Sequence, residues 1–183
     1  MARRNVIRMG HPTLKKVAEL VTQADLSSEW FKELLVDMHD TMKIEGGIGI
    51  AAPQIDVSKQ VALIEIPKDS ERYGNLPPSP LITIINPTIH YLTEEKQSFF
   101  EGCLSVPGLR GLVERPKSIR VDYLDELGHK QSIEAHDFLA TVFQHELDHL
   151  FGKIYVERMT DLSTLTFNEE YVQFNSKKID PIE

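Results

Sequence analysis

The sequence predicts an α+β protein in which antiparallel sheets pack around a central helix carrying a His-Glu-x-x-His motif. Two segments, near residues 28–44 and 137–151, have the apolar periodicity of helices. Short β-rich segments bounded by Gly, Pro and Asn lie between them, and residues 125–129 have the composition of a hairpin turn. A chain of 183 residues has the length of one domain, so we expect a single domain over 1–183.

Composition and charge exclude several classes of protein. Hydrophobic residues make up 41% and charged residues 26%, as in ordinary globular proteins. The net charge of −8 provides no field for phosphates, so we expect no nucleic-acid binding. No apolar run approaches the roughly 20 residues that cross a bilayer, and no long apolar region follows the basic start. The single cysteine, Cys103, suits a reducing compartment, and we expect a cytoplasmic protein without membrane contact.

The first half of the chain contains one clear helix. Pro12 is expected to open a short helical turn, and Ser27 or Ser28 to cap the longer helix. Gly46-Gly47 is expected to end that helix. One apolar stripe is expected to face the core: Trp30, Phe31, Leu34, Leu35, Met38 and Met42.

The strands come next, separated by turn residues. The stretch 67–80 contains four prolines and a Gly-Asn pair, which predicts a surface loop bordering two strands. Asn86-Pro87 is expected to interrupt the strand that follows this loop. The predicted strands are 60–66, 81–85, 88–91, 118–124 and 131–135.

The segment 137–151 is predicted to be the central helix. Its apolar and histidine positions recur every three or four residues, Asp137 can serve as N-cap, and Gly152 can end it. His145 and His149 lie one turn apart on one face and can bind a single metal ion. Glu146 is turned by about 100° from His145, so it can reach a water beside the ion without being a ligand. The alternative is a helix that merely carries two histidines.

A catalytic metal usually has three protein ligands, and the third distinguishes the enzyme classes. Tyr155 occupies the position where metzincin proteases have a histidine, which excludes that class. Glu169 lies at the distance of the glutamate ligand in thermolysin-like peptidases and stays a candidate. Cys103, in Glu101-Gly102-Cys103-Leu104-Ser105, is the other candidate, although a lone cysteine is commonly a small buried residue.

The stretch 47–54 (Gly-Ile-Gly-Ile-Ala-Ala-Pro-Gln) is the second unusual feature. It nearly matches a dinucleotide-binding fingerprint, but a helix precedes it and Pro53-Gln54 follows where that fingerprint needs a helix. Its small residues allow a close approach of the backbone to another group. A tight turn packed on the core is the alternative reading.

These three stretches together resemble the ordered motifs of peptide deformylases. The motifs are Gly47-x-Gly49-x-Ala51-Ala52-x-Gln54, Glu101-Gly102-Cys103-Leu104-Ser105 and Gln144-His145-Glu146-x-x-His149. The likeness extends to Pro12-x-Leu14 and to 107–115, and covers the chain from about the N-terminus to Glu157. Three ordered motifs are far more specific than any one of them.

The resemblance implies that the enzyme hydrolyses the formamide of N-formylmethionyl peptides and nascent chains and releases formate. Cys103, His145 and His149 would hold one divalent metal ion, usually Fe²⁺ in the family, with Zn²⁺, Ni²⁺ or Co²⁺ able to occupy the site. Glu146 would move the proton, and the Gln54 side chain and the Leu104 N–H would stabilise the oxyanion.

The resemblance also implies a substrate site. Gly49 and its neighbours would pair with the substrate backbone. Glu101 and Arg110 are also expected at the substrate site, where Glu101 would bond Gln54 or a neighbouring backbone group and Arg110 would hold Glu101. The expected pocket for the methionine side chain is lined by Ile48, Leu104, Val142 and His145.

The C-terminal tail departs from many bacterial relatives, which end in a basic helix thought to dock on the ribosome. Residues 158–183 form an acidic tail here, so ribosome contact by that route is in doubt. We expect Phe167, Tyr171 and Phe174 to pack the tail on the body. Three alternatives stay open at this point: a thermolysin-like peptidase, a non-catalytic module that the metal merely stabilises, and a deformylase-like fold whose activity has drifted.

Overall fold

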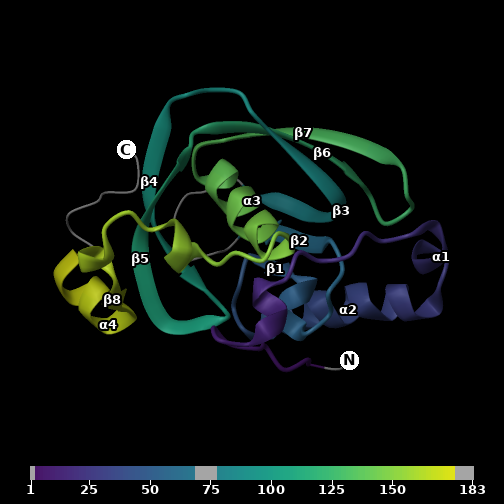
Figure 1. Ribbon diagram of the computed structural model, residues 1–183, viewed down its shortest axis with the longest axis horizontal. Helices are drawn as coiled ribbons and strands as arrows, with labels where there is room; N and C mark the ends of the chain where they lie inside the picture. The colour runs from purple at the N-terminus through teal and green to yellow at the C-terminus, as the bar shows by residue number, and fades with distance from the viewer. Residues whose placement is uncertain (1–2, 69–77, 176–183) are drawn as a thin grey trace.

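The computed structural model describes residues 3–68 and 78–175 and has two antiparallel sheets around one buried helix (Figure 1). The five-stranded sheet has the order β1-β2-β3-β6-β7, and the three-stranded sheet has the order β4-β5-β8. The predicted α+β class is confirmed. The strands are β1 Gly49–Ala51, β2 Val61–Ile66, β3 Ser79–Tyr91, β4 Lys96–Cys103, β5 Val106–Pro116, β6 Ser118–Leu124, β7 Lys130–His136 and β8 Thr166–Phe167. The helices are α1 Gln23–Leu26, α2 Glu29–Ile44, α3 Asp137–Leu150 and α4 Asn168–Glu170.

The core lies on both faces of the five-stranded sheet. One cluster joins α3 to the sheet through residues such as Ile64, Ile84, Phe143 and Leu147. A second cluster lies on the opposite face and includes α2. Adjacent residues of a strand point to opposite faces, so in β1 Ile50 belongs to the α2 cluster and Ala51 to the α3 cluster. Ile48, which precedes the strand, also packs in the α3 cluster.

Helix α2 follows the prediction closely. Ser28 is its N-cap, with the hydroxyl accepting from the Phe31 N–H, and Gly46 follows its end with φ +69°. The predicted stripe is wrong at Trp30, whose side chain is largely exposed, and Leu35 is only partly buried. Pro12 opens a single 3₁₀ turn, Pro12–Lys15.

Strand β3 begins earlier and runs further than predicted. It starts at Ser79, so the last residues of the predicted 67–80 loop belong to a strand, while residues 69–77 of that loop lie outside the described part. The expected break at Asn86-Pro87 is a bulge within one strand, with Asn86 at φ +49°. The Asn86 side chain bonds the Val21 backbone through both its oxygen and its nitrogen, which stabilises the bulge.

The long β4–β5 hairpin was not predicted and forms most of the second sheet (Figure 1). Its polar, glycine-rich and proline-rich sequence obscures the alternation of a strand. The register pairs Glu101 with Gly111 and Gln97 with Arg115, and it shifts just before Cys103. This irregularity places Cys103 at the turn of the hairpin, facing α3.

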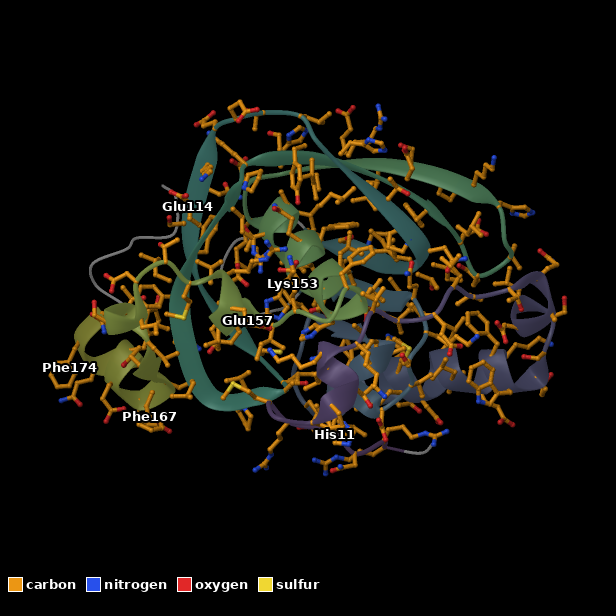
Figure 2. The ribbon with its side chains drawn as sticks, viewed as in Figure 1. His11, Glu114, Lys153, Glu157, Phe167 and Phe174 are labelled. Atoms are coloured by element: carbon orange, nitrogen blue, oxygen red, sulfur yellow. The ribbon has the colours of Figure 1, made fainter. Side chains whose placement is uncertain are left out.

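The described part of the C-terminal tail contacts the outer sheet. Strand β8 pairs with β5, and the Tyr171 ring lies against Phe100 and under the Arg110 guanidinium. Phe167 and Phe174, which were also expected to pack, are exposed and point outward (Figure 2). In the part of the chain that the structure describes, no helix is long and apolar enough to span a membrane.

Candidate metal centre

Helix α3 is the buried element that carries the histidine pair. It starts at Asp137, and His136 is the N-cap, so the prediction that Asp137 caps the helix is wrong by one residue. Gly152 follows its end with φ +70°, as predicted. A Cβ at Gly152 would also lie 2.7 Å from the Lys15 carbonyl oxygen, so this position requires glycine for two independent reasons.

Three side chains converge where α3 meets the β4–β5 turn. The ligand atoms of Cys103, His145 and His149 all lie within 4.8 Å of one another, and the Cys103 Sγ is 3.3 Å from the His149 Nε2. Thiolate and imidazole ligands at about 2.3 and 2.0 Å from a tetrahedral ion would be about 3.5 Å apart. The geometry therefore fits one metal ion, and the donor set suits zinc or iron.

A chain of ion pairs holds the outer face of His145. Its Nδ1 lies 2.7 Å from Glu101 Oε2, which leaves Nε2 free to act as a ligand. Glu101 is in turn held by Arg115 through two bonds, and Arg115 also donates to Asp148. Asp148 also accepts from Arg158, which is the outermost member of the chain of ion pairs.

Arg115, rather than Arg110, is therefore the residue that holds Glu101. The expectation that Arg110 does so is wrong, since its Nε donates to Asn168 Oδ1 and its guanidinium lies over Tyr171. Arg115 was missed because the hairpin was missed. Strand alternation was the available signal, since Val113 and Arg115 point to the same inner face.

The electrostatics favour the thiolate form of Cys103, which is the form that binds a metal ion. Burial by itself raises the pKa of Cys103, but the charges and hydrogen bonds of His149 and His145 outweigh burial and lower that pKa to about 5. Burial lowers the pKa of His145, and its bonds to Cys103 and Glu101 more than reverse that effect. The thiolate that a metal requires is thus stabilised by its own neighbours.

Glu146 differs from the other charged residues of the site because it has no cationic partner of its own. Its side chain is 5% exposed, and its Oε2 has no hydrogen-bond partner among the described residues. Burial raises its pKa to about 7, against the opposing charges of His145 and His149. A carboxyl group with a pKa near neutrality beside a candidate metal site can accept and return a proton at physiological pH.

Strand β1 passes directly over Glu146. A Cβ at Gly49 would overlap the Glu146 carboxylate, which explains why glycine is needed here. Ile48 and Val142 are buried in the core cluster beside this strand, whose outer edge has no partner strand among the described residues. Close approach of backbone to a side chain, expected for the 47–54 stretch, is therefore present.

Gln54 and Leu104 lie on the two turns beside the cysteine. The Gln54 Oε1 accepts from the Ala51 N–H at 2.8 Å, and its Nε2 points to Cys103 Sγ at 3.5 Å and Ser105 Oγ at 3.4 Å. The contact to Ser105 Oγ is long for a hydrogen bond, whereas the contact to Cys103 Sγ has an ordinary length for a sulfur acceptor. The Leu104 side chain lies close to Gly47, where a Cβ would be 3.2 Å from Leu104 Cδ1.

The rival ligands are not part of this cluster. Glu169 is exposed in the tail, at the beginning of α4. Tyr155 is buried, and its ring stacks on His145 with centroids 6.1 Å apart. These positions leave Cys103 as the third candidate ligand.

Fold and side chains together define the class: an α+β protein with a hydrolase-type candidate metal centre on one helix and one hairpin turn. The chain belongs to the polypeptide deformylase family, whose family model matches residues 3–164. It is therefore an enzyme that acts on formylated peptides, in a family that removes the N-formyl group from nascent peptides.

Individual relatives cover nearly the whole chain. A peptide deformylase of Leptospira biflexa is 42% identical over 172 residues, which are 93% of this chain and 95% of the relative. The Met-Ala-Ser-bound class I type b peptide deformylase of Acinetobacter baumannii is 38% identical with a TM-score of 0.82, covering 86% of this chain and 99% of that one. The peptide deformylase of Ehrlichia chaffeensis is 32% identical with a TM-score of 0.78, covering 89% and 91%.

Proposed function

We propose that this chain is a metal-dependent hydrolase that removes the N-formyl group from the N-terminal formylmethionine of new polypeptides and releases formate. The observation that carries this proposal is the convergence of Cys103, His145 and His149 within 4.8 Å, beside the buried, unpaired carboxylate of Glu146. A Met-Ala-Ser peptide bound to the Acinetobacter baumannii relative supports a substrate that begins with methionine.

The three ligands would hold one divalent ion, which we infer to be Fe²⁺ in the cell, with Zn²⁺, Ni²⁺ or Co²⁺ able to occupy the same site. Such an ion lowers the pKa of water and polarises the carbonyl under attack. The residues around it do the positioning. Glu101, fixed by Arg115, holds the His145 ring in the orientation that presents Nε2 inward.

Glu146 carries the proton in this proposal. It takes a proton from the attacking water as the new C–O bond forms, and it gives that proton to the departing nitrogen as the C–N bond breaks. The products are formate and a free amino terminus. Burial raises the pKa of Glu146 to about 7 in the metal-free protein, which suits a group that both takes and gives a proton.

The negative oxygen of the tetrahedral intermediate requires donors. The Gln54 Nε2–H and the Leu104 backbone N–H are the donors we assign, since both flank Cys103 on its turn side. Gln54 is suited to this role because its oxygen accepts from the Ala51 N–H, which turns its nitrogen toward Cys103 and Ser105.

The substrate backbone is proposed to add to the free edge of β1 at Gly49. Ile48, Val142 and Leu104 are proposed to contact the methionine side chain. Glu101 supports the site from behind, through His145. Arg110 was expected to bind substrate as well; it is engaged by Asn168 and Tyr171, so its substrate role stays a prediction without support from its contacts.

The proposed partners are N-formylmethionyl peptides and nascent chains. Residues 159–175 contain no Lys or Arg, so the described tail has no basic helix for docking on a ribosome.

The test is formate release from a short formylmethionyl peptide by protein purified without air. We expect release by the parent and near-complete loss in Glu146→Gln at equal metal content, because the variant keeps the shape but lacks the base. Folded, metal-loaded parent protein that releases no formate would contradict the proposed substrate. A Glu146→Gln variant as active as the parent would contradict the assignment of the base.

A further inference from the structure

We propose that the extended N-terminal segment 6–9 is a positioning element for the reaction: it holds the turn of Gln54 and the turn of Ser105 at a fixed separation. The inference rests on the proposed function, because it assumes that Gln54 and Leu104 supply the two oxyanion donors. None of residues 6–9 is itself proposed to touch substrate. Their effect is exerted through the two turns that they bind.

Two main-chain hydrogen bonds carry the argument. The Ile7 N–H donates to the Gln54 carbonyl at 2.8 Å, and the Met9 N–H donates to the Ser105 carbonyl at 2.8 Å. Alternate residues of an extended chain point their N–H groups to the same side, so the N–H groups of Ile7 and Met9 can bind acceptors on that one side. The segment thus bridges two turns that lie about 50 residues apart in the sequence (Figure 1, purple, beside the β4–β5 turn).

The two turns belong to different sheets. Gln54 lies in the 3₁₀ turn Ala52–Ile55, which follows β1 of the five-stranded sheet. Ser105 lies between β4 and β5 of the three-stranded sheet. The Leu104 N–H lies two peptide units before the Ser105 carbonyl, in the same short turn between β4 and β5. Holding that carbonyl therefore restrains one donor, and holding the Gln54 turn restrains the other.

The Gln54 side chain makes the direct contacts between the two turns. Its Nε2 lies 3.4 Å from Ser105 Oγ, near the outer limit of a hydrogen bond, and 3.5 Å from Cys103 Sγ, an ordinary distance to a weak sulfur acceptor. The two bonds from Ile7 and Met9 are shorter and use rigid backbone groups. We therefore attribute the separation of the two turns largely to the N-terminal segment.

The segment is also anchored at its start. The Arg4 N–H donates to Thr41 Oγ1 at 3.0 Å, and the Arg4 guanidinium pairs with Asp37 at 2.7 Å, both on α2. After Met9 the chain turns at Gly10, which has φ +102°, and enters the 3₁₀ turn Pro12–Lys15. Arg8 and Met9 are exposed, so the segment contributes position more than buried apolar surface.

Loss of either bond should loosen one donor without removing it. A misplacement on the order of 1 Å in a catalytic group costs up to about 100-fold, so a partial displacement is expected to lower kcat by about tenfold. KM should change by less than a factor of about two, because these donors act on the transition state rather than on bound substrate. The metal ligands are untouched, so metal content should be unchanged.

The experiment compares Ile7→Pro and Met9→Pro with Arg8→Pro in the full chain. Proline removes the N–H and favours an extended backbone before it. No bond of the Arg8 N–H is recorded among the described residues, so Arg8→Pro is the matched control. Rates are expressed per metal-loaded, folded molecule. If a proline variant folds poorly, replacing Met9 by its α-hydroxy acid removes the same N–H and keeps the side chain.

A double-mutant cycle with Gln54→Ala shows which oxyanion donor each N-terminal hydrogen bond acts through. If Ile7 acts through the Gln54 donor, Ile7→Pro should have little further effect in the Gln54→Ala background, while Met9→Pro should keep its effect. Equal kcat for all three proline variants, or equal effects of Ile7→Pro in both backgrounds, would overturn the inference. Inactivity of the folded, metal-loaded parent would instead refute the proposed function, so the two failures are distinguishable.

Discussion

Substituting alanine for Gly49 tests whether strand β1 positions Glu146, the proposed catalytic base. A Cβ at Gly49 would lie 2.6 Å from Glu146 Cδ and 2.7 Å from its Cγ. Ordinary carbon–carbon contact is about 3.5–4.0 Å, so the carboxyl group or the strand must move by about 1 Å. A shift of this size in a catalytic group costs about 100-fold in rate, equivalent to about 2.7 kcal/mol of transition-state stabilisation.

The assay is steady-state formate release together with metal content and chemical denaturation. We expect Gly49→Ala to keep its metal, since Cys103, His145 and His149 are untouched, and to lose about 100-fold in kcat. The displaced buried carboxyl group should also lower the free energy of unfolding by about 1–3 kcal/mol.

The control is Ile50→Val on the same strand. Ile50 is fully buried but packs in the α2 cluster on the opposite face, so this change should cost about 1 kcal/mol of stability and leave kcat unchanged. A Gly49→Ala enzyme with a raised KM and normal kcat would refute the reasoning, because it would show that the glycine serves the substrate backbone alone.

Three further predictions follow from the same contacts. Cys103→Ala should lose metal while Glu169→Ala retains it; the reverse, measured by metal analysis after dialysis, would favour a thermolysin-like site. In metal-free protein the folded state holds the Glu146 proton to about pH 7 while the unfolded chain releases it near the ordinary value of 4.5, so parent stability falls as pH rises between these values. Glu146→Gln should therefore gain about 3 kcal/mol relative to the parent between pH 4 and pH 8 in urea titrations, and a constant difference would contradict the raised pKa. Arg115→Leu should lower the free energy of unfolding by about 3–5 kcal/mol, because it leaves buried Glu101 and Asp148 without their shared partner. Arg158→Leu, whose side chain is 38% exposed, should lower it by about 1 kcal/mol. Similar losses in the two variants would show that the buried ion pairs contribute no more than the exposed one.

The sequence predicted the parts of the site that have local signals. The spacing of His145, Glu146 and His149 is meaningful because a helix repeats every 3.6 residues, and the structure places all three on α3. Ser28 and Gly152 were predictable because caps depend on a few neighbouring residues.

Long-range pairing had no comparable signal. The β4–β5 hairpin escaped prediction because Gly102, Pro107, Gly108 and Gly111 suggest turns, whereas their positions depend on strand register. Arg115 became interpretable only when the hairpin brought it to Glu101. The N-terminal bridge was unpredictable for a similar reason, since backbone bonds from Ile7 and Met9 are independent of the side chains that carry sequence patterns.

The two buried glutamates beside His145 show how one environment can assign two roles. Burial raises the pKa of both carboxyl groups, but Glu101 has Arg115 and His145 as partners, and their bonds lower its pKa below the usual value. Glu146 has no such partner, so burial dominates and its pKa rises to about 7. The ionised group orients a ligand, and the titrating group can move a proton. Arg115 therefore separates the two proposed roles from behind the site, where its hydrogen bonds go to Glu101 and Asp148.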